Sequence, residues 1–367
     1  MILHDWSALT LQLGHTHEMR STARVLGGIE IGVSPVATGL ENFWYAVEHS
    51  KTLQSRPISL QLLNKRYVLF RDQAGMAHAL VDSCAHRGAS LGGGWVEENC
   101  IRCPYHGWSY NSEGRCVRIP ADTEGTTIPA KAQLAVLPAV ERGGFIWIFP
   151  GETDKADPSL IPPFPEFGQA GWRAVQGEYS WDAHFSRVVE AGLDTSHAPF
   201  VHKPFFPNRD DASVHPLEIT ATDYSVSTHQ QVKPPKRLGL LKYIIKKDRK
   251  HSSSTLTSYL PCINRIAIDF NWRGYQYIYF ASNIPVSDNE TLTKWIGVRN
   301  FLPQAWADKN SIKNTVETYE EDKAVVETQP RTPSWVTQGE DLLLASDQLI
   351  LAYRKTLAKA CSRKGDQ

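Results

Sequence analysis

The feature that most constrains this chain is a pair of short segments that each place a cysteine close to a histidine. Cys84 and His86 form a Cys-x-His pair, and Cys103 and His106 form a Cys-x-x-His pair further along. Two thiolates and two imidazoles are the ligands of a Rieske [2Fe–2S] cluster, whose two irons are held by Cys and His respectively. A Cys2His2 zinc site is the competing interpretation, but zinc modules usually open with two cysteines. The spacing therefore favours the iron–sulfur cluster.

The length and charge of the chain bound its architecture and its partners. With 367 residues, the chain is too long for one small cluster module, and its length predicts about two domains. Basic and acidic residues balance at 39 each. The net charge therefore favours neither a nucleic-acid partner nor an acidic surface.

The cysteines and the first residues bear on the compartment. Four cysteines remain beside the two candidate ligands, and we expect them to be reduced, mostly buried thiols (Cys100, Cys116, Cys262 and Cys361). Residues 1–20 lack the basic start and apolar run of a signal peptide. No segment approaches the roughly 18 continuous apolar residues of a membrane span. We therefore expect a cytoplasmic protein without a membrane span.

The hydrophobic pattern predicts an α+β fold in two parts. After an N-terminal extension at 1–40, an all-β cluster domain is expected over 41–150, with strands at 58–63, 67–71, 77–81, 114–119 and 145–149. A proline-rich stretch at 150–168 reads as a crossing segment. In the second domain, 151–367, we expect an antiparallel sheet packed against helices. The predicted helices lie near 181–198 and 305–328, and the strands at 217–232 and 255–300.

A second candidate metal site begins with Asp194, His197 and His202. Asp194 and His197 share a helix face, whereas His197 and His202 would diverge by about 140° on a regular helix. Pro199 lies between the histidines and removes a helical hydrogen bond, so a bend can bring them together. Two His and one carboxylate form the facial triad of a non-haem Fe(II) oxygenase. The sequence thus predicts such a triad, with its carboxylate still to be found.

The missing carboxylate is expected on the helix that contains residues 312–329. Five acidic residues lie there, and an apolar stripe runs along one face. Glu321 is predicted to point away from that stripe, whereas Glu320 and Asp322 flank it on either side. Periodicity alone leaves the choice between Glu320 and Asp322 open.

With these motifs together, the chain resembles the Rieske non-haem iron oxygenases, terminal oxygenase component, over about residues 41–355. The segment from Glu320 to Gln329 resembles the third-ligand segment of that family, in which an Asp precedes a Gln by seven positions, and it selects Asp322. The group that includes pheophorbide a oxygenase and vanillate demethylase is the most similar. One departure is Ala191 after Glu190, where the family often has Asn.

The resemblance implies a division of roles. Cys84, His86, Cys103 and His106 would hold the [2Fe–2S] cluster, and His197, His202 and Asp322 would hold Fe(II). Electrons would come from a separate ferredoxin or reductase fed by NAD(P)H, because the chain has no dinucleotide or flavin fingerprint. Asp194 would bridge to a cluster histidine of a neighbouring subunit, which implies a head-to-tail homotrimer.

The expected activity is O2-dependent hydroxylation or oxidative demethylation of an aromatic or polycyclic small molecule. Ring cis-dihydroxylation uses the same ligands and stays open. A pure Rieske electron carrier is a further alternative, but Ala89 and Tyr105 replace the disulfide cysteines of the respiratory type. The pocket wall is expected to draw on Phe270, Trp272, Tyr275, Tyr277 and Tyr279, which otherwise form sheet core. A basic stretch at 233–254 is read as a solvated face, or else as a lid or donor-docking patch.

Overall fold

The computed structural model describes residues 39–123, 125–202, 217–232, 252–331 and 341–362, all within one compact unit, Ser34–Gln367. Most of the N-terminal extension predicted at 1–40, and of the basic stretch at 233–254, lies outside these residues. Within them, no helix is long and apolar enough to cross a bilayer.

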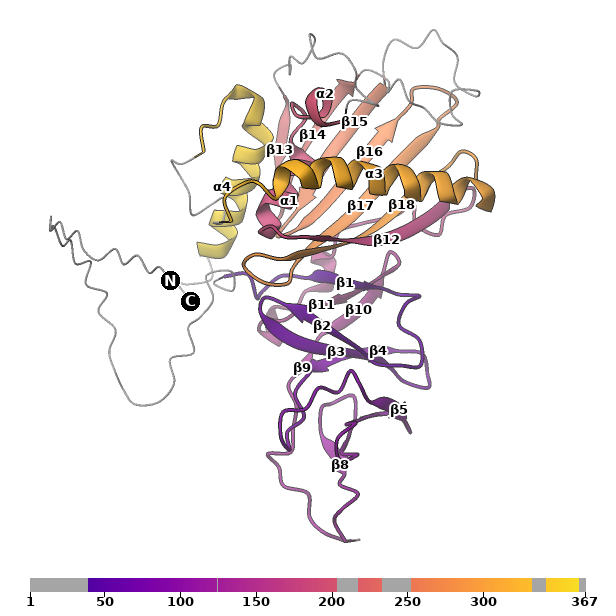
Figure 1. Ribbon diagram of the computed structural model, residues 1–367, viewed down its shortest axis with the longest axis vertical. Coiled ribbons are helices and arrows are strands. Elements are labelled where there is room, and N and C mark those ends of the chain that lie inside the picture. Colours follow the sequence, from indigo (N-terminus) through magenta and orange to yellow (C-terminus); the bar gives the residue numbers. More distant parts are fainter. Residues whose placement is uncertain (1–38, 124, 203–216, 233–251, 332–340, 363–367) are drawn as a thin grey trace, which may run out of the picture. The chain divides into compact units, whose positions relative to one another are not determined.

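Three small antiparallel sheets occupy the first part of the described chain (Figure 1). The first has the order β1-β11-β10, the second β2-β3-β4-β9 and the third β5-β6-β7-β8. Their strands are β1 (Tyr45–His49), β2 (Ile58–Leu62), β3 (Lys65–Arg71), β4 (Ala77–Val81), β5 (Trp95–Glu97), β6 (Cys100–Arg102), β7 (Ser109–Tyr110), β8 (Cys116–Arg118), β9 (Val136–Leu137), β10 (Ala139–Arg142) and β11 (Phe145–Ile148). The predicted all-β region is confirmed.

Tight hairpins set the register of these strands. Leu63 and Asn64 join β2 to β3 with φ of 52° and 61°, and Glu98 and Asn99 join β5 to β6 with 52° and 62°. Two successive positive φ values define the type I′ turn, whose twist matches that of the flanking strands. The short strands β5 and β6 were not predicted, because three residues are too few to show a clear alternation.

A seven-stranded antiparallel sheet dominates the second part, in the order β12-β18-β17-β16-β15-β14-β13. Its strands are β12 (Arg173–Trp181), β13 (Ile219–Ala221), β14 (Ser225–Val232), β15 (Ser252–Tyr259), β16 (Ile263–Asp269), β17 (Gln276–Pro285) and β18 (Thr291–Arg299). The predicted antiparallel sheet is confirmed. The first strand, β12, was not predicted, and it pairs with the last strand, β18, along all nine of its residues.

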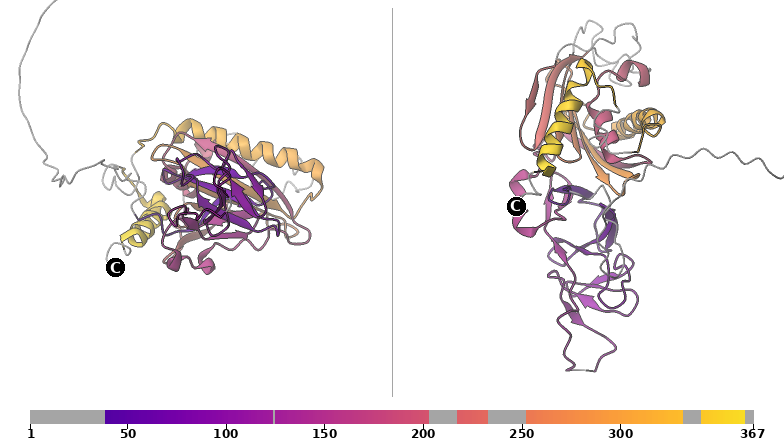
Figure 2. Two further views of the ribbon diagram at one scale, coloured as in Figure 1. Left: turned by 90° about the horizontal axis from the view of Figure 1, so that it is seen from below. Right: turned by 90° about the vertical axis from the view of Figure 1, so that its left-hand side faces the viewer.

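Helices pack against this sheet. They are α1 (Phe185–Leu193), α2 (Ala198–Val201), α3 (Asp308–Val326) and α4 (Gln348–Ser362), with short 3-10 turns at Thr153–Lys155, Pro158–Leu160, Ala305–Ala307 and Ala345–Asp347. Helix α1 contacts strands β15 to β17 as well as α3 and α4. Figures 1 and 2 show α3 running across the strands and α4 running along them. Helix α4 was not predicted.

The single helix predicted near 181–198 is wrong in its extent. Strand β12 continues to Trp181, and His184 then caps α1 by accepting the Ser186 backbone N–H at Nδ1. Helix α1 ends at Leu193, and α2 starts only at Ala198. Pro199 lies in the first turn of α2, where its missing N–H costs no hydrogen bond, so the break precedes His197 rather than following it.

One continuous core joins the first part of the chain to the large sheet. Phe280 of β17 packs on Phe145 of β11 and stacks on Phe164 at 4.9 Å between ring centroids. A buried ion pair joins Lys294 of β18 to Glu48 of β1 at 2.8 Å. The domain boundaries predicted at 40 and 150 stay predictions.

Candidate metal centres

Two loops of similar backbone geometry present the first group of candidate ligands. In each loop a glycine N–H closes a turn onto a cysteine carbonyl: Gly88 onto Cys84 at 2.8 Å, and Gly107 onto Cys103 at 3.0 Å. Both glycines have positive φ, 73° and 71°, which a residue with a Cβ rarely adopts. The loops lie between β4 and β5 and between β6 and β7. They therefore depend on the small sheets for their position.

The thiols are buried, whereas the imidazoles are exposed. Cys84 and Cys103 are 3% and 1% exposed, and burial raises the pKa of the Cys103 thiol. The Nδ1 atoms of His86 and His106 lie 3.1 Å apart in solvent-exposed rings. Tyr110 contacts the buried thiol end of this ligand group, since its hydroxyl lies 3.1 Å from Cys84 Sγ. An inner sulfur pair and an outer nitrogen pair are the donor set that a [2Fe–2S] cluster of the Rieske type requires.

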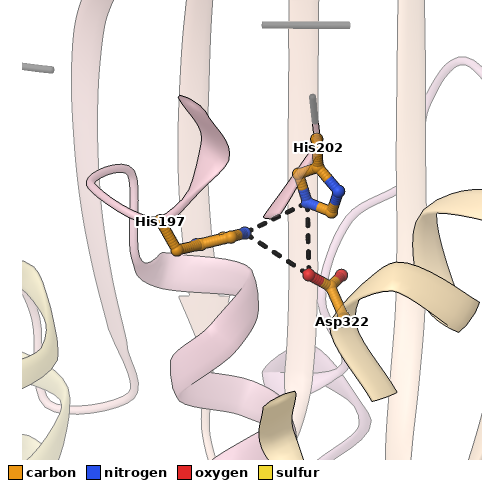
Figure 3. A group of neighbouring side chains, drawn as sticks. All are labelled: His197, His202 and Asp322. Carbon is orange, nitrogen blue, oxygen red and sulfur yellow. Dashed lines mark hydrogen bonds and ion pairs between the residues drawn. The ribbon is translucent and has the colours of Figure 1, made fainter. Parts of the chain in front are cut away.

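The second group of ligands comes together around the short helix α2. His197 is the residue before α2, His202 is the residue after it, and Asp322 comes from α3. The Nε2 atoms of the two histidines lie 3.1 Å apart, and Asp322 Oδ1 lies 3.4 Å from the first and 3.2 Å from the second (Figure 3). A one-turn helix places both rings on its α3 side. Among the described residues, this is the one group of three acidic, His or Cys ligand atoms that meet within 4.8 Å.

The two alternatives of the sequence pattern lie in different surroundings. Asp322 faces both histidines, whereas Glu320 lies beside Tyr179, where burial and then the nearby Glu320 carboxylate raise the tyrosine pKa. Glu321, which was predicted to point away from the apolar stripe, has its Oε2 2.9 Å from His202 Nδ1. The contact with His202 was not predicted, because an apolar stripe locates the core and not a polar site beside it.

Asp194 stands behind His197. Its Oδ2 lies 3.6 Å from His197 Nδ1, and its Oδ1 accepts hydrogen bonds from the backbone N–H and the hydroxyl of Ser196, each at 2.7 Å. Asp194 is also the C-cap residue of α1. The sequence prediction of this carboxylate next to a candidate ligand therefore corresponds to a close approach in the structure.

The histidines and carboxylates of this candidate metal group shift each other's pKa values toward their charged forms. Burial would lower the pKa of His197, but Asp194 and then Asp322 outweigh it and raise that pKa to about 9. Burial would raise the pKa of Asp322, but the two histidines hold it below its usual value. A bound divalent ion would replace the protons on the rings and neutralise the carboxylates. The donor types and their spacing thus fit a metal such as Fe(II).

A cavity of about 460 Å³ opens beside Asp194, His197 and Asp322. Its far wall is a charged network in which Arg354 binds both carboxylate oxygens of Glu190, at 2.8 and 2.9 Å. Asp341 joins this network through contacts with Arg187 and Arg354, at 2.8 and 2.6 Å. The position where the family often has Asn, Ala191, also lines the cavity.

The aromatic residues predicted to wall the pocket lie elsewhere. Phe270, Trp272, Tyr275 and Tyr277 cluster with Phe301, and Tyr279 packs near Tyr319 of α3. Among the described residues, none of the five lines the cavity beside the metal group. The charged network, by contrast, was missed because it joins residues from α1, α4 and the segment before α4.

Comparison with known proteins follows the same division of the chain. Residues 43–138 match the Rieske [2Fe-2S] domain, and residues 181–363 match the vanillate O-demethylase oxygenase C-terminal domain. The chain is 35% identical over 172 residues to chlorophyllide a oxygenase of Chlamydomonas reinhardtii, covering 47% of this chain and 26% of that protein. It is 27% identical over 344 residues to methylxanthine N1-demethylase of Pseudomonas putida, covering 89% and 92%.

A solved structure of the same Pseudomonas putida demethylase, with caffeine, superimposes with a TM-score of 0.76 at 25% identity, covering 89% of this chain and 93% of that one. Several curated relatives are matched only in part. Besides the chlorophyllide a oxygenase, the dicamba O-demethylase oxygenase component of Stenotrophomonas maltophilia is 33% identical over 45% of this chain, and the match covers 48% of its length.

Proposed function

This chain belongs to the Rieske non-haem iron oxygenases, as a terminal oxygenase component, and on that premise we propose that it oxidises an aromatic or polycyclic small molecule with O2. The reaction is hydroxylation or oxidative removal of a methyl group. The relatives support the substrate class, because their names refer to ring compounds such as a methylxanthine and a chlorophyllide. The observation that carries the proposal is the meeting of His197, His202 and Asp322 beside a cavity, in a chain that also has Rieske loops.

We propose that each candidate ligand has one role. Cys84 and Cys103 hold the inner iron of the cluster, and His86 and His106 hold the outer iron. His197 Nε2, His202 Nε2 and Asp322 Oδ1 bind Fe(II). When bound, the cluster supplies electrons one at a time and the Fe(II) supplies open coordination positions for O2. The protein contributes the buried thiol end, which excludes water, and the orientation of the rings.

Asp194 has a bridging role in this proposal. It orients His197 from behind and borders the cavity, so a group that enters the cavity from another subunit can reach it. The exposed rings of His86 and His106 suit such a contact with a neighbouring copy. A head-to-tail homotrimer would place the cluster of one subunit beside Asp194 of the next.

The remaining partners follow from the chemistry. A separate ferredoxin or NAD(P)H-dependent reductase delivers electrons to the exposed histidine end of the cluster. We also propose a reducing, cytoplasmic setting, which the six free cysteines support.

Two measurements test the proposal. Iron analysis of the anaerobically reconstituted protein is expected to give about three irons per chain, because a carrier with only the cluster holds about two. Turnover of a panel of N-, O- and C-methylated ring compounds with ¹⁸O2 and a surrogate reductase is expected to place one labelled atom in a hydroxylated product or, on N- or O-demethylation, in the released formaldehyde, which is trapped at once before it exchanges with water. Two irons per chain, with no oxygen consumption on any ring compound, would contradict it. Two labelled atoms in a cis-diol would replace demethylation by ring dihydroxylation.

A further inference from the structure

His202 is held from both sides by two consecutive residues of α3. Its Nδ1 lies 2.9 Å from Glu321 Oε2, and its Nε2 lies 3.2 Å from Asp322 Oδ1. Side chains of neighbouring helix residues diverge by about 100°. The imidazole ring therefore lies between the two carboxylates, with one ring nitrogen against each.

The local backbone alone holds His202 weakly. It is the C-cap residue of a four-residue helix, and its φ and ψ of −92° and 53° are not helical. Its backbone N–H donates to the Ala198 carbonyl at 3.0 Å. A helix of this length is not stable in isolation. The orientation of the ring therefore depends on contacts with other elements, and α3 supplies two of them.

The contact with Glu321 also suits the tautomer that a metal-binding His202 needs. A neutral imidazole has one N–H and one lone pair, and a carboxylate at Nδ1 can only accept. Asp322 Oδ1 faces Nε2 and can likewise only accept, so the two carboxylates by themselves do not fix the proton. With a metal ion on Nε2, the single ring proton lies on Nδ1, where Glu321 accepts it. His197 differs, because its carboxylate partner Asp194 lies at 3.6 Å and has one oxygen engaged by Ser196.

We propose that Glu321 is a positioning residue that presets His202 for metal binding. The inference rests on the proposed Fe(II) site and adds to it a residue that lies next to a ligand without being one. Carboxylates behind a ligating histidine typically change metal affinity or activity by about 10- to 100-fold when they are removed. Because Glu321 and Asp322 share one helix, movement of α3 would displace a ligand and the support of another ligand together.

The test compares Glu321→Ala and Glu321→Gln with the control Glu317→Gln. Glu317 lies one turn earlier on α3 and pairs with the exposed Lys313 at 3.5 Å. Each full-length protein is loaded with Fe(II) under anaerobic conditions, and release of the mononuclear iron to a chelator is followed. The electron paramagnetic resonance spectrum of the Fe(II)–NO adduct is recorded beside it. The visible spectrum of the cluster and the thermal midpoint monitor folding.

Glu321→Ala is expected to release the mononuclear iron about 10- to 100-fold faster than wild type and to broaden the NO-adduct spectrum. Glu321→Gln keeps a hydrogen-bond acceptor, so its iron release rate is expected to lie between those of wild type and Glu321→Ala. The control Glu317→Gln is expected to release iron at the wild-type rate. Wild-type release rates and spectra in both Glu321 variants would overturn the positioning role. If wild type itself binds no iron beyond the cluster, the proposed function fails, which is a separate result.

Discussion

Replacing Lys294 with methionine tests the contact between the first part of the chain and the seven-stranded sheet. Lys294 Nζ lies 2.9 and 2.8 Å from the two oxygens of Glu48 and 2.7 Å from Glu178. The side chains of Lys294 and Glu48 are each only 7% exposed. Methionine keeps most of the volume, so the change mainly removes the charge.

The expected loss of stability comes from Glu48. Removal of one member of a buried pair leaves an uncompensated charge and typically costs about 3–5 kcal/mol. Glu48 still accepts the His49 backbone N–H at 2.8 Å, so we expect the lower end, about 3 kcal/mol. Glu178 is 62% exposed and returns to water, so it adds little.

A double-mutant cycle by urea unfolding measures this cost. Lys294→Met is expected to lower the free energy of unfolding by about 3 kcal/mol, and Glu48→Gln in that background to restore at least about 2 kcal/mol, because the buried charge is gone. The cluster spectrum should be unchanged in the folded variants. A Lys294→Met protein within about 0.5 kcal/mol of wild type, or a Glu48→Gln change that restores nothing, would refute the reasoning.

Three further predictions concern the proposed centres and pH. Asp194→Asn should keep both metal centres, yet lower turnover and the rate of cluster oxidation about 10- to 100-fold, as stopped-flow oxidation of the reduced cluster would reveal. Normal turnover with both metals bound would remove the bridging role. Asp322→Ala should hold about two irons per chain instead of about three, by iron analysis with the cluster spectrum as control. Burial lowers the pKa of His184 to about 4. As pH falls below about 6.5, the unfolded chain therefore binds a proton on this histidine, whereas the folded chain does so only near pH 4. The stability that the neutral, buried ring contributes is complete above about pH 6.5 and is lost progressively towards pH 4. Between pH 7 and pH 5, the free energy of unfolding of wild type should fall by about 2 kcal/mol more than that of His184→Asn, a variant that keeps a helix cap. Equal pH dependence of the two free energies, measured by urea unfolding, would disprove this.

Much of the fold was accessible from sequence because its signals are local. Alternating and apolar runs predicted the strands from 58 to 81 and the sheet from 255 to 300, and these predictions are confirmed. Helix α3 was also expected close to its observed bounds, Asp308–Val326. Strand β12, which follows a proline-rich stretch, and helix α4 were missed. Pairing of β12 with β18 joins residues more than 100 positions apart, which no local pattern encodes.

The residues of the candidate metal group also divide into those that a local sequence pattern predicted and those that it did not. His197 and His202 were predicted from their spacing around Pro199, although the break in the helix comes earlier than expected. Asp322 was selected only by resemblance to a family, because periodicity left Glu320 equally placed. The contact of Glu321 with His202 was not predicted, since an apolar stripe locates the core and not a polar site beside it.

By itself, the sequence determined the chemistry: two thiolates and two imidazoles on glycine-closed loops, then two further histidines and a helix rich in carboxylates. These are properties of residue types at short spacing, and short spacing needs no tertiary structure. Only the tertiary structure decided which carboxylate meets the histidines, which one stands behind His202, and that Lys294 and Glu48 join two sheets. Those contacts depend on where α3 and β18 lie against distant elements, and packing of the whole core sets that position.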